Sequence, residues 1–167
     1  MDTNSDLDQR TLKVASFNCR SVKNSASCVK DLCQISDIVL LQEHWLLPND
    51  LNFLSSLDKE FLTYGTSPVD LGKGILCGRP YGGVAVLWHK SLGVNVSIVS
   101  DDDDRILAVR ISNDVNCDLL LICVYLPVEC TNNTQCVYMM VVIRILLNSN
   151  NATLWRNWII RMYMASE

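Results

Sequence analysis

A continuous apolar run sets the strongest limit on how this chain can fold. Ile38 to Leu41 is uninterrupted and contains two β-branched residues, a composition typical of a strand buried on both faces. Earlier in the chain, Leu12 to Asn18 alternates apolar and polar side chains, which predicts another strand. Between them, Val29, Leu32 and Cys33 recur at helical spacing. This order predicts two parallel neighbouring strands joined by a crossover helix, and therefore an α/β fold.

The composition favours a folded domain and argues against a broad surface for binding nucleic acid. The 167 residues are 49% hydrophobic and 19% charged, which is typical of one globular domain. The net charge is −4, whereas proteins that bind many phosphates usually carry a basic surplus. Any phosphate chemistry must therefore come from a local site, where a metal ion can supply positive charge. The charge weakens a DNA-binding interpretation without excluding it.

The cysteines and the apolar segments indicate where such a protein works. The eight cysteines are irregularly spaced and contain no C-x-x-C pair, so we expect reduced thiols rather than a zinc site or a disulfide framework. Residues 1–10 are polar and acidic, unlike a secretory signal. The longest apolar stretch, Tyr138 to Leu147, is interrupted by Arg144 and is too short to span a bilayer. We expect an intracellular protein, nuclear or cytoplasmic, without signal peptide or transmembrane segment and without membrane partners.

A long glycine-rich segment divides the predicted elements of the middle of the chain. Residues 65–83 hold six of the seven glycines and predict a long loop. Before it, Asn49 or Asp50 can cap a short helix carrying Leu51, Leu54 and Leu57. After it, short turns separate four β-rich runs, which predicts an antiparallel meander. These runs are residues 84–88, 94–99, 106–111 and 119–125.

The character of the sequence changes at Pro127. Residues 128–167 contain no Gly, Pro, Asp, His or Lys, which is unusual for forty residues of an α/β enzyme. Two apolar blocks, residues 137–147 and 154–164, are interpreted as possible helices, although neither has a clear polar face. We therefore divide the chain into a polar tail (1–11), an α/β region (12–127) and a divergent tail (128–167).

Polar side chains stand where the two predicted parallel strands end. Asn18 closes the first strand, and Glu43 follows the second. Ligand sites in layered α/β folds gather outside strand ends, and a carboxylate there suits a hard cation such as Mg²⁺. On spacing alone, one Glu and one Asn do not make a metal site. A turn-forming Asn18 and a solvated Glu43 explain the pattern at least as well.

Four segments, in order, resemble the endonuclease domain of non-LTR retrotransposons. They are SFNCRSVK, IVLLQEHWL, GRPYGGVAVLWHK and ICVYLP, all within Leu12 to Pro127. That domain belongs to the endonuclease/exonuclease/phosphatase superfamily, together with apurinic endonucleases, deoxyribonuclease and inositol-phosphate phosphatases. The resemblance covers the amino-terminal half of such a domain. It implies a partial, truncated four-layer α/β sandwich, with two mixed β-sheets face to face and helices outside.

The resemblance also implies roles for three residues. Glu43 would bind Mg²⁺ or Mn²⁺, which neutralises charge on the phosphate and the leaving oxygen. Asn18 would orient the phosphate and the nucleophilic water, and would belong to the metal site. Tyr125 would contact the scissile phosphate, although a half-buried aromatic with a solvated hydroxyl is an alternative. The implied partner is DNA, the metal would bind weakly if at all, and the sequence leaves the oligomeric state open.

Several nearby residues allow two interpretations each. Gly82 and Gly83 fit either a close backbone approach or simple entry into a strand. Arg105 can support the site, as an arginine does in the family, or form a surface ion pair. His44 follows Glu43 directly, and neighbours on a strand face opposite ways, so we do not expect it to share the role of Glu43.

Two later motifs of the superfamily, Gly-Asp-x-Asn and Ser-Asp-His, are absent. The last Asp is Asp118 and the last His is His89. Because general acid–base help alone is worth about 10²–10⁴-fold, we expect the isolated chain to be inactive or nearly so. A truncated or frame-shifted product of a retrotransposon explains this pattern. Two alternatives stay open, a non-catalytic binding module and a phosphatase of small phosphoesters, because fold analogy does not separate substrates.

Overall fold

The structure is a computed structural model that describes residues 11–73, 78, 80–103, 105–112, 117–129, 135–147 and 159–166. Its longest helix is α1 (Ala26–Ile35), and three short 3₁₀ helices are η1 (Pro48–Ser56), η2 (Leu71–Lys73) and η3 (Lys90–Leu92). The strands are β1 (Thr11–Asn18), β2 (Ile38–Gln42), β3 (Phe61–Thr66), β4 (Val84–His89), β5 (Asn95–Asp103), β6 (Ile106–Ser112), β7 (Cys117–Glu129), β8 (Gln135–Leu147) and β9 (Ile159–Ser166).

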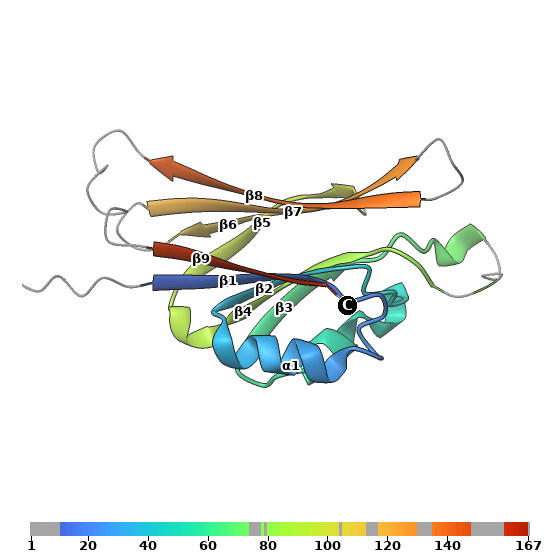
Figure 1. Cartoon of the computed structure of the whole chain (residues 1–167), viewed down its shortest axis with the longest axis horizontal. Coiled ribbons are helices and arrows are strands. Elements are labelled where there is room, and N and C mark those ends of the chain that lie inside the picture. The colour runs from blue at the N-terminus through green and yellow to red at the C-terminus, as the bar shows by residue number, and fades with distance from the viewer. Residues whose placement is uncertain are drawn as a thin grey trace, which may run out of the picture.

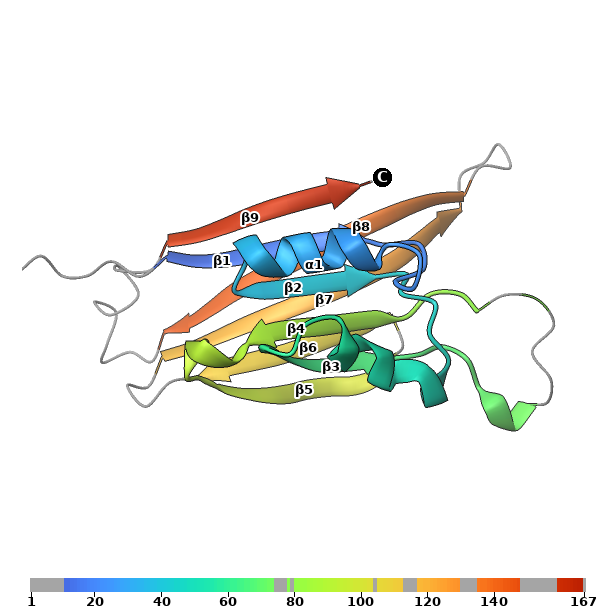
Figure 2. The same ribbon diagram turned by 90° about the horizontal axis from the view of Figure 1, so that it is seen from below.

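The strands form two sheets that lie face to face (Figure 1). The first sheet is mixed, in the order β3-β4-β2-β1-β9, and the second is antiparallel, in the order β5-β6-β7-β8. Helix α1 lies on the outer face of the first sheet (Figures 1 and 2). The predicted α/β class and the partial sandwich are confirmed. In the part of the chain that the structure describes, the helices flank one sheet only.

The predicted strand–helix–strand unit is present at the start of the chain. β1 and β2 pair in parallel, from Val14 opposite Ile38 to Asn18 opposite Gln42. α1 connects them and buries Val29 and Cys33 against the sheet. The pairing follows from the crossover, since a helix of this length carries the chain back to the edge where β1 began.

Hydrophobic residues fill two layers, one on each face of the first sheet. Because successive residues of a strand point to opposite faces, Val39 and Leu41 pack toward α1 and η1, while Ile38 and Leu40 pack toward the second sheet. All five residues of β2 are buried, the four of the apolar run as predicted and the polar Gln42 in addition. The layer between the sheets is completed by residues of β6 and β7, among them Leu107, Val109, Leu119 and Leu121.

The predicted meander is correct for three of its four strands. β5, β6 and β7 are antiparallel neighbours, but β4 pairs with β2 and β3 in the other sheet. The chain crosses between the sheets after β4, through η3 and Gly93, whose φ of 58° is left-handed. The short turn between β4 and β5 therefore leads the chain from the first sheet to the second and does not close a hairpin. β3 was not predicted, because Gly65 lies within it and extends the glycine-rich pattern into a strand.

The short helix before the loop begins earlier than predicted. Leu47 is its capping residue and Pro48 stands at its start, so the expected caps Asn49 and Asp50 are wrong. Proline is well suited to the first helical position, because its φ is preset and its missing N–H has no partner there. Asp50 instead forms an ion pair with Lys23 at 2.9 Å.

The two apolar blocks of the tail, in their described residues 137–147 and 159–164, are strands, so the prediction of possible helices is wrong there; residues 154–158 lie outside the described residues. β8 pairs antiparallel with β7, and β9 pairs in parallel with β1 (Figure 2). The tail thus adds one strand to each sheet. Residues 137–147 are rich in β-branched Val and Ile and lack a polar face, and both properties favour strands. Among the described residues, no helix has the length and apolar character needed to cross a membrane.

Four described cysteines form no disulfide, namely Cys19, Cys28, Cys33 and Cys123. Burial raises the pKa of Cys123 to about 12, and burial together with the Asp58 carboxylate raises the pKa of Cys33 to about 12. Cys28 is exposed.

With iodoacetamide at pH 8, we expect Cys28 to be modified at least about 100-fold faster than Cys33 or Cys123, because the buried thiols react only when the chain opens. Peptide mapping by mass spectrometry checks this, and equal rates would contradict the described burial.

Candidate active site

The surfaces that the two sheets turn toward each other change from apolar to polar at one end of the sandwich. The change occurs near the carboxyl ends of β1 and β2, which coincide because the strands are parallel. β7 follows the same gradient from the opposite sheet. Successive inward positions are Leu12, Val14, Ser16 and Asn18 in β1, Ile38, Leu40 and Gln42 in β2, and Leu119, Leu121, Cys123 and Tyr125 in β7.

Asn18 and Glu43 meet at this end. The side-chain amide of Asn18 donates through Nδ2 to Oε1 of Glu43 at 2.7 Å. Oδ1 of Asn18 accepts the backbone N–H of Arg20 at 3.3 Å, which holds the amide in one orientation. The pair is half-buried. A charge-assisted bond of this length orients the carboxylate strongly.

The loops that follow β1 and β2 contain unusual backbone. Arg20, Ser21, Glu43 and Trp45 are non-glycine residues with φ of 37°, 95°, 54° and 54°. Each such residue costs on the order of 1–3 kcal/mol and persists only where its surroundings fix it. The N–H of Ser21 donates to the carbonyl of Glu43 at 2.9 Å, and that of Trp45 to Gly82 at 3.0 Å. Strained backbone of this kind gathers at functional sites, and here it carries Glu43.

His44 is a buried, neutral side chain that secures the Glu43 loop. Its Nδ1 accepts the N–H of Leu46 at 3.0 Å, so Nε2 carries the proton and donates to the carbonyl of Thr66 at 2.9 Å. Burial lowers the pKa of His44 to about 4, and its backbone hydrogen bonds offset this only in part. The His44 ring is thus bonded to Leu46 and Thr66, whereas the Glu43 carboxylate is bonded to Asn18. Alternation along a strand is not the reason for this separation, because β2 ends at Gln42. The hydrogen bond by which His44 joins the Glu43 loop to Thr66 was not predicted, because Thr66 lies in the unpredicted strand β3.

The glycine pair before β4 makes the close approach that was one of its two interpretations. A Cβ on Gly83 would lie 2.4 Å from Cε1 of His44, and one on Gly82 would lie 3.0 Å from Cγ of Pro68. Their φ angles are 85° and 61°, both left-handed. Two independent features therefore require glycine at position 83, namely the left-handed backbone and the imidazole packed against it.

Tyr125 approaches the site from the other sheet. Its N–H donates to the carbonyl of Arg105 at 2.9 Å. Burial raises the pKa of Tyr125, the Glu43 carboxylate raises it further, and the charge of Arg105 opposes both. Glu43 and Arg105 therefore both lie within electrostatic range of the Tyr125 phenol. The fold thus brings Asn18, Glu43 and Tyr125 to one end of the sandwich.

The donor set at this end is sparse but suits a hydrated divalent cation. Mg²⁺ keeps several waters and is commonly held by one or two carboxylates together with substrate phosphate. Glu43 supplies one carboxylate, of which Oε1 is bonded to Asn18. Among the side chains that the structure describes, no three His, Cys, Asp or Glu residues gather around one point. These residues fit a cation that binds jointly with a phosphate rather than one held by the protein alone.

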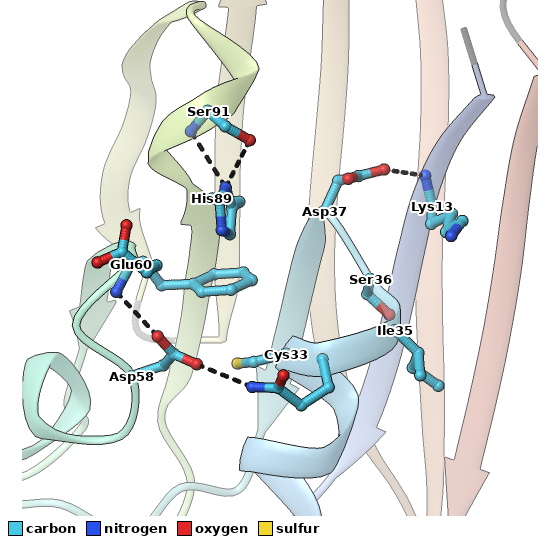
Figure 3. A pocket seen from close by; sticks show the side chains of 11 residues that line it. Lys13, Cys33, Ile35, Ser36, Asp37, Asp58, Glu60, His89 and Ser91 are labelled. Atoms are coloured by element: carbon cyan, nitrogen blue, oxygen red, sulfur yellow. Dashed lines mark hydrogen bonds between the residues drawn. The ribbon is translucent and has the colours of Figure 1, made fainter.

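A separate pocket of about 280 Å³ lies at the opposite ends of β1 and β2 (Figure 3). Asp37 and Asp58 line it, but their carboxylates already accept the backbone N–H groups of Lys13 and Glu60, at 2.7 and 2.8 Å. His89 lies there too, hydrogen-bonded to Ser91 at 2.6 Å. None of the predicted site residues contributes to this pocket.

Solved structures of DNA-processing enzymes resemble the chain in part. They include an AP endonuclease from Leishmania major (TM-score 0.49, 16% identity, covering 64% of this chain and 38% of that one). They also include an AP endonuclease from Archaeoglobus fulgidus (TM-score 0.42, 19% identity, 60% and 37%). A third is a 3′ phosphatase from Neisseria bound to a product DNA hairpin (TM-score 0.40, 18% identity, 59% and 37%). The chain therefore spans less than two fifths of each of these proteins.

Sequence comparison gives the more specific result. No curated protein matches the chain. Residues 15–162 match the sequence profile of the Endonuclease/Exonuclease/phosphatase family, so the match includes the second half of β1, all of β2 and β7, and most of the tail. It covers far more than half of the 167 residues. The chain belongs to the Endonuclease/Exonuclease/phosphatase family.

Proposed function

We propose that this chain carries the metal- and phosphate-binding part of a DNA phosphodiesterase of the kind found in retrotransposons. The observation that carries the proposal is the 2.7 Å bond between Asn18 and Glu43. It lies where two parallel strands end, on strained backbone, and within electrostatic range of Tyr125. A carboxylate held this firmly at a strand end, in a family that generally depends on divalent metals, is best explained as a metal ligand.

Each side chain has a definable task in this proposal. A bound Mg²⁺ or Mn²⁺ would supply positive charge to the phosphate and the leaving oxygen. Glu43 would hold that ion, and Asn18 would keep the carboxylate oriented through Nδ2. The raised pKa of Tyr125 keeps its hydroxyl protonated at neutral pH, so it can donate a hydrogen bond to a phosphate oxygen. The charge of Arg105 beside it favours an anionic ligand.

The same residues do not supply proton transfer. The sequence contains two histidines. His44 is buried with both ring nitrogens bonded, and His89 lines the pocket at the far end of the sheet. A water nucleophile would thus have no histidine base, and general base help is worth about 10²–10⁴-fold. We propose that the 167-residue chain binds metal and DNA but cleaves DNA slowly or not at all.

Glu43→Gln tests the metal role, because it removes the charge and keeps the shape. We expect Mn²⁺-dependent affinity for a fluorescein-labelled DNA duplex to fall by at least about 10–100-fold, the loss that is typical even of groups that only support a metal ligand. Fluorescence anisotropy with and without Mn²⁺ measures this. Nicking of supercoiled plasmid by the wild-type chain should stay close to background.

Glu60→Gln is the matched control, since Glu60 lines the pocket at the other end of the sheet. This variant should bind DNA as the wild type does. Equal Mn²⁺-dependent affinity of the wild type and Glu43→Gln would contradict the proposal. Plasmid nicking that persists in Glu43→Gln would contradict both the assigned role of Glu43 and the expected inactivity.

A further inference from the structure

A buried polar cluster joins the two sheets directly below the site. Ser16 and Gln42 come from the first sheet and Cys123 from the second, and all three side chains are fully buried. The amide of Gln42 donates through Nε2 to Sγ of Cys123 at 3.0 Å and to Oγ of Ser16 at 3.2 Å. Oγ of Ser16 also lies 3.4 Å from Oε1 of Gln42. The rest of this layer is mainly aliphatic.

The thiol of Cys123 makes a second connection. It lies 3.6 Å from the carbonyl of Leu41, to which it donates. Burial raises the pKa of Cys123 to about 12, so the thiol keeps the proton that this bond requires. Cys123 therefore accepts from one residue of β2 and donates to the residue before it. These two directional contacts tie β7 to β2.

The cluster lies next to both parts of the site. On the first sheet, Gln42 precedes Glu43 directly and stands opposite Asn18 in the strand register. On the second sheet, Cys123 is two residues before Tyr125, so both side chains face the first sheet.

Stability alone does not account for a polar cluster here. A buried amide must have all its hydrogen bonds satisfied, and an aliphatic side chain of the same size fills such a space without that demand. Satisfied polar networks instead fix one relative arrangement of the groups they join. Aliphatic contacts are not directional, so they leave the two sheets freer to shift against each other. The expected effect of the cluster is therefore to fix the position of one sheet relative to the other.

We propose that Gln42 and Cys123 are positioning residues, which fix the sheet carrying Asn18 and Glu43 relative to the sheet carrying Tyr125. This role rests on the proposed function, because it presupposes that Glu43 and Tyr125 act on one metal-bound phosphate. A ligand held from two separate sheets requires that their groups be placed within about 0.5 Å. The cluster provides that constraint one residue from Glu43 and two residues from Tyr125.

The test measures the coupling between Glu43 and Tyr125 with and without the cluster. Mn²⁺-dependent affinity for the labelled DNA duplex is determined for Glu43→Gln, Tyr125→Phe and the double variant, first in the wild-type background and then with Gln42→Leu or Cys123→Val. We expect a coupling of about tenfold in the wild type, and a loss of most of it in either altered background. Cys123→Ser keeps a donor and acceptor, and should retain most of the coupling.

Leu121→Val is the matched control, because Leu121 faces the same layer from the next inward position of β7. It should lower the thermal midpoint and leave the coupling unchanged. If the cluster only stabilises the fold, Gln42→Leu and Cys123→Val should give the same result as this control. Variants that lower the thermal midpoint but keep the wild-type coupling would therefore contradict the positioning role. If wild-type binding does not depend on Mn²⁺ and Glu43, the proposed function fails, and the positioning role fails with it.

Discussion

Replacing Gly83 with alanine is expected to lower the free energy of unfolding by about 4 kcal/mol, a large part of what a domain of this size has. Two costs combine. A residue with a side chain at a φ of 85° is strained, and its Cβ would lie 2.4 Å from Cε1 and 2.5 Å from Nε2 of His44. The imidazole cannot move aside cheaply, because Leu46 and Thr66 hold both of its nitrogens.

Two other glycines with positive φ, Gly82 and Gly93, separate these two costs. Gly93 has a φ of 58° with nothing within 4 Å of an added Cβ, so Gly93→Ala should cost only the backbone strain, about 1 kcal/mol. Gly82→Ala, at 3.0 Å from Cγ of Pro68, should fall between the two. Urea unfolding at pH 7 gives all three values. A Gly83→Ala variant no less stable than Gly93→Ala would show that His44 does not pack as described.

Acidification is expected to destabilise the fold through His44. The folded-state pKa of His44 is lowered from 6.5 to about 4, so the unfolded chain takes up the proton first as pH falls. The stability that the neutral imidazole contributes is complete above pH 6.5 and is lost progressively toward pH 4. The difference of about 2.5 pH units, at about 1.36 kcal/mol each, sets an upper limit of about 3 kcal/mol.

Comparison with His44→Gln isolates this contribution, because carboxylates also titrate as the pH falls. Glutamine can donate to Thr66 but has no group that ionises in this range. Urea unfolding of both proteins between pH 7 and 4.5 should show a smaller decline for His44→Gln. Parallel declines would mean that His44 ionises freely in the folded state, and therefore that it is not buried.

The sequence alone determined the secondary structure and the pairing of elements that are close together in the chain. The alternation in Leu12 to Asn18 and the apolar run Ile38 to Leu41 each report which faces of a strand are buried, and a crossover helix makes the strands parallel. Parallel neighbours end at the same edge, so the meeting of Asn18 and Glu43 could be predicted without a structure. Both conclusions rest on contacts that chain connectivity enforces.

Only the tertiary structure decided the partners of strands and side chains far apart in the chain. Periodicity tells which face of a strand is buried but not which strand lies beside it, so β4 was assigned to the wrong sheet. The tail strands were interpreted as helices because a continuous apolar run has no periodicity that separates the two. Gln42 and Cys123, 81 positions apart, carry no signal in their own neighbourhoods that they meet. His44 and Gly83 likewise meet only because β2 and β4 are paired. The spacing of apolar residues determines local secondary structure. These long-range contacts arise instead from the packing of strands and sheets against each other, which no local pattern specifies.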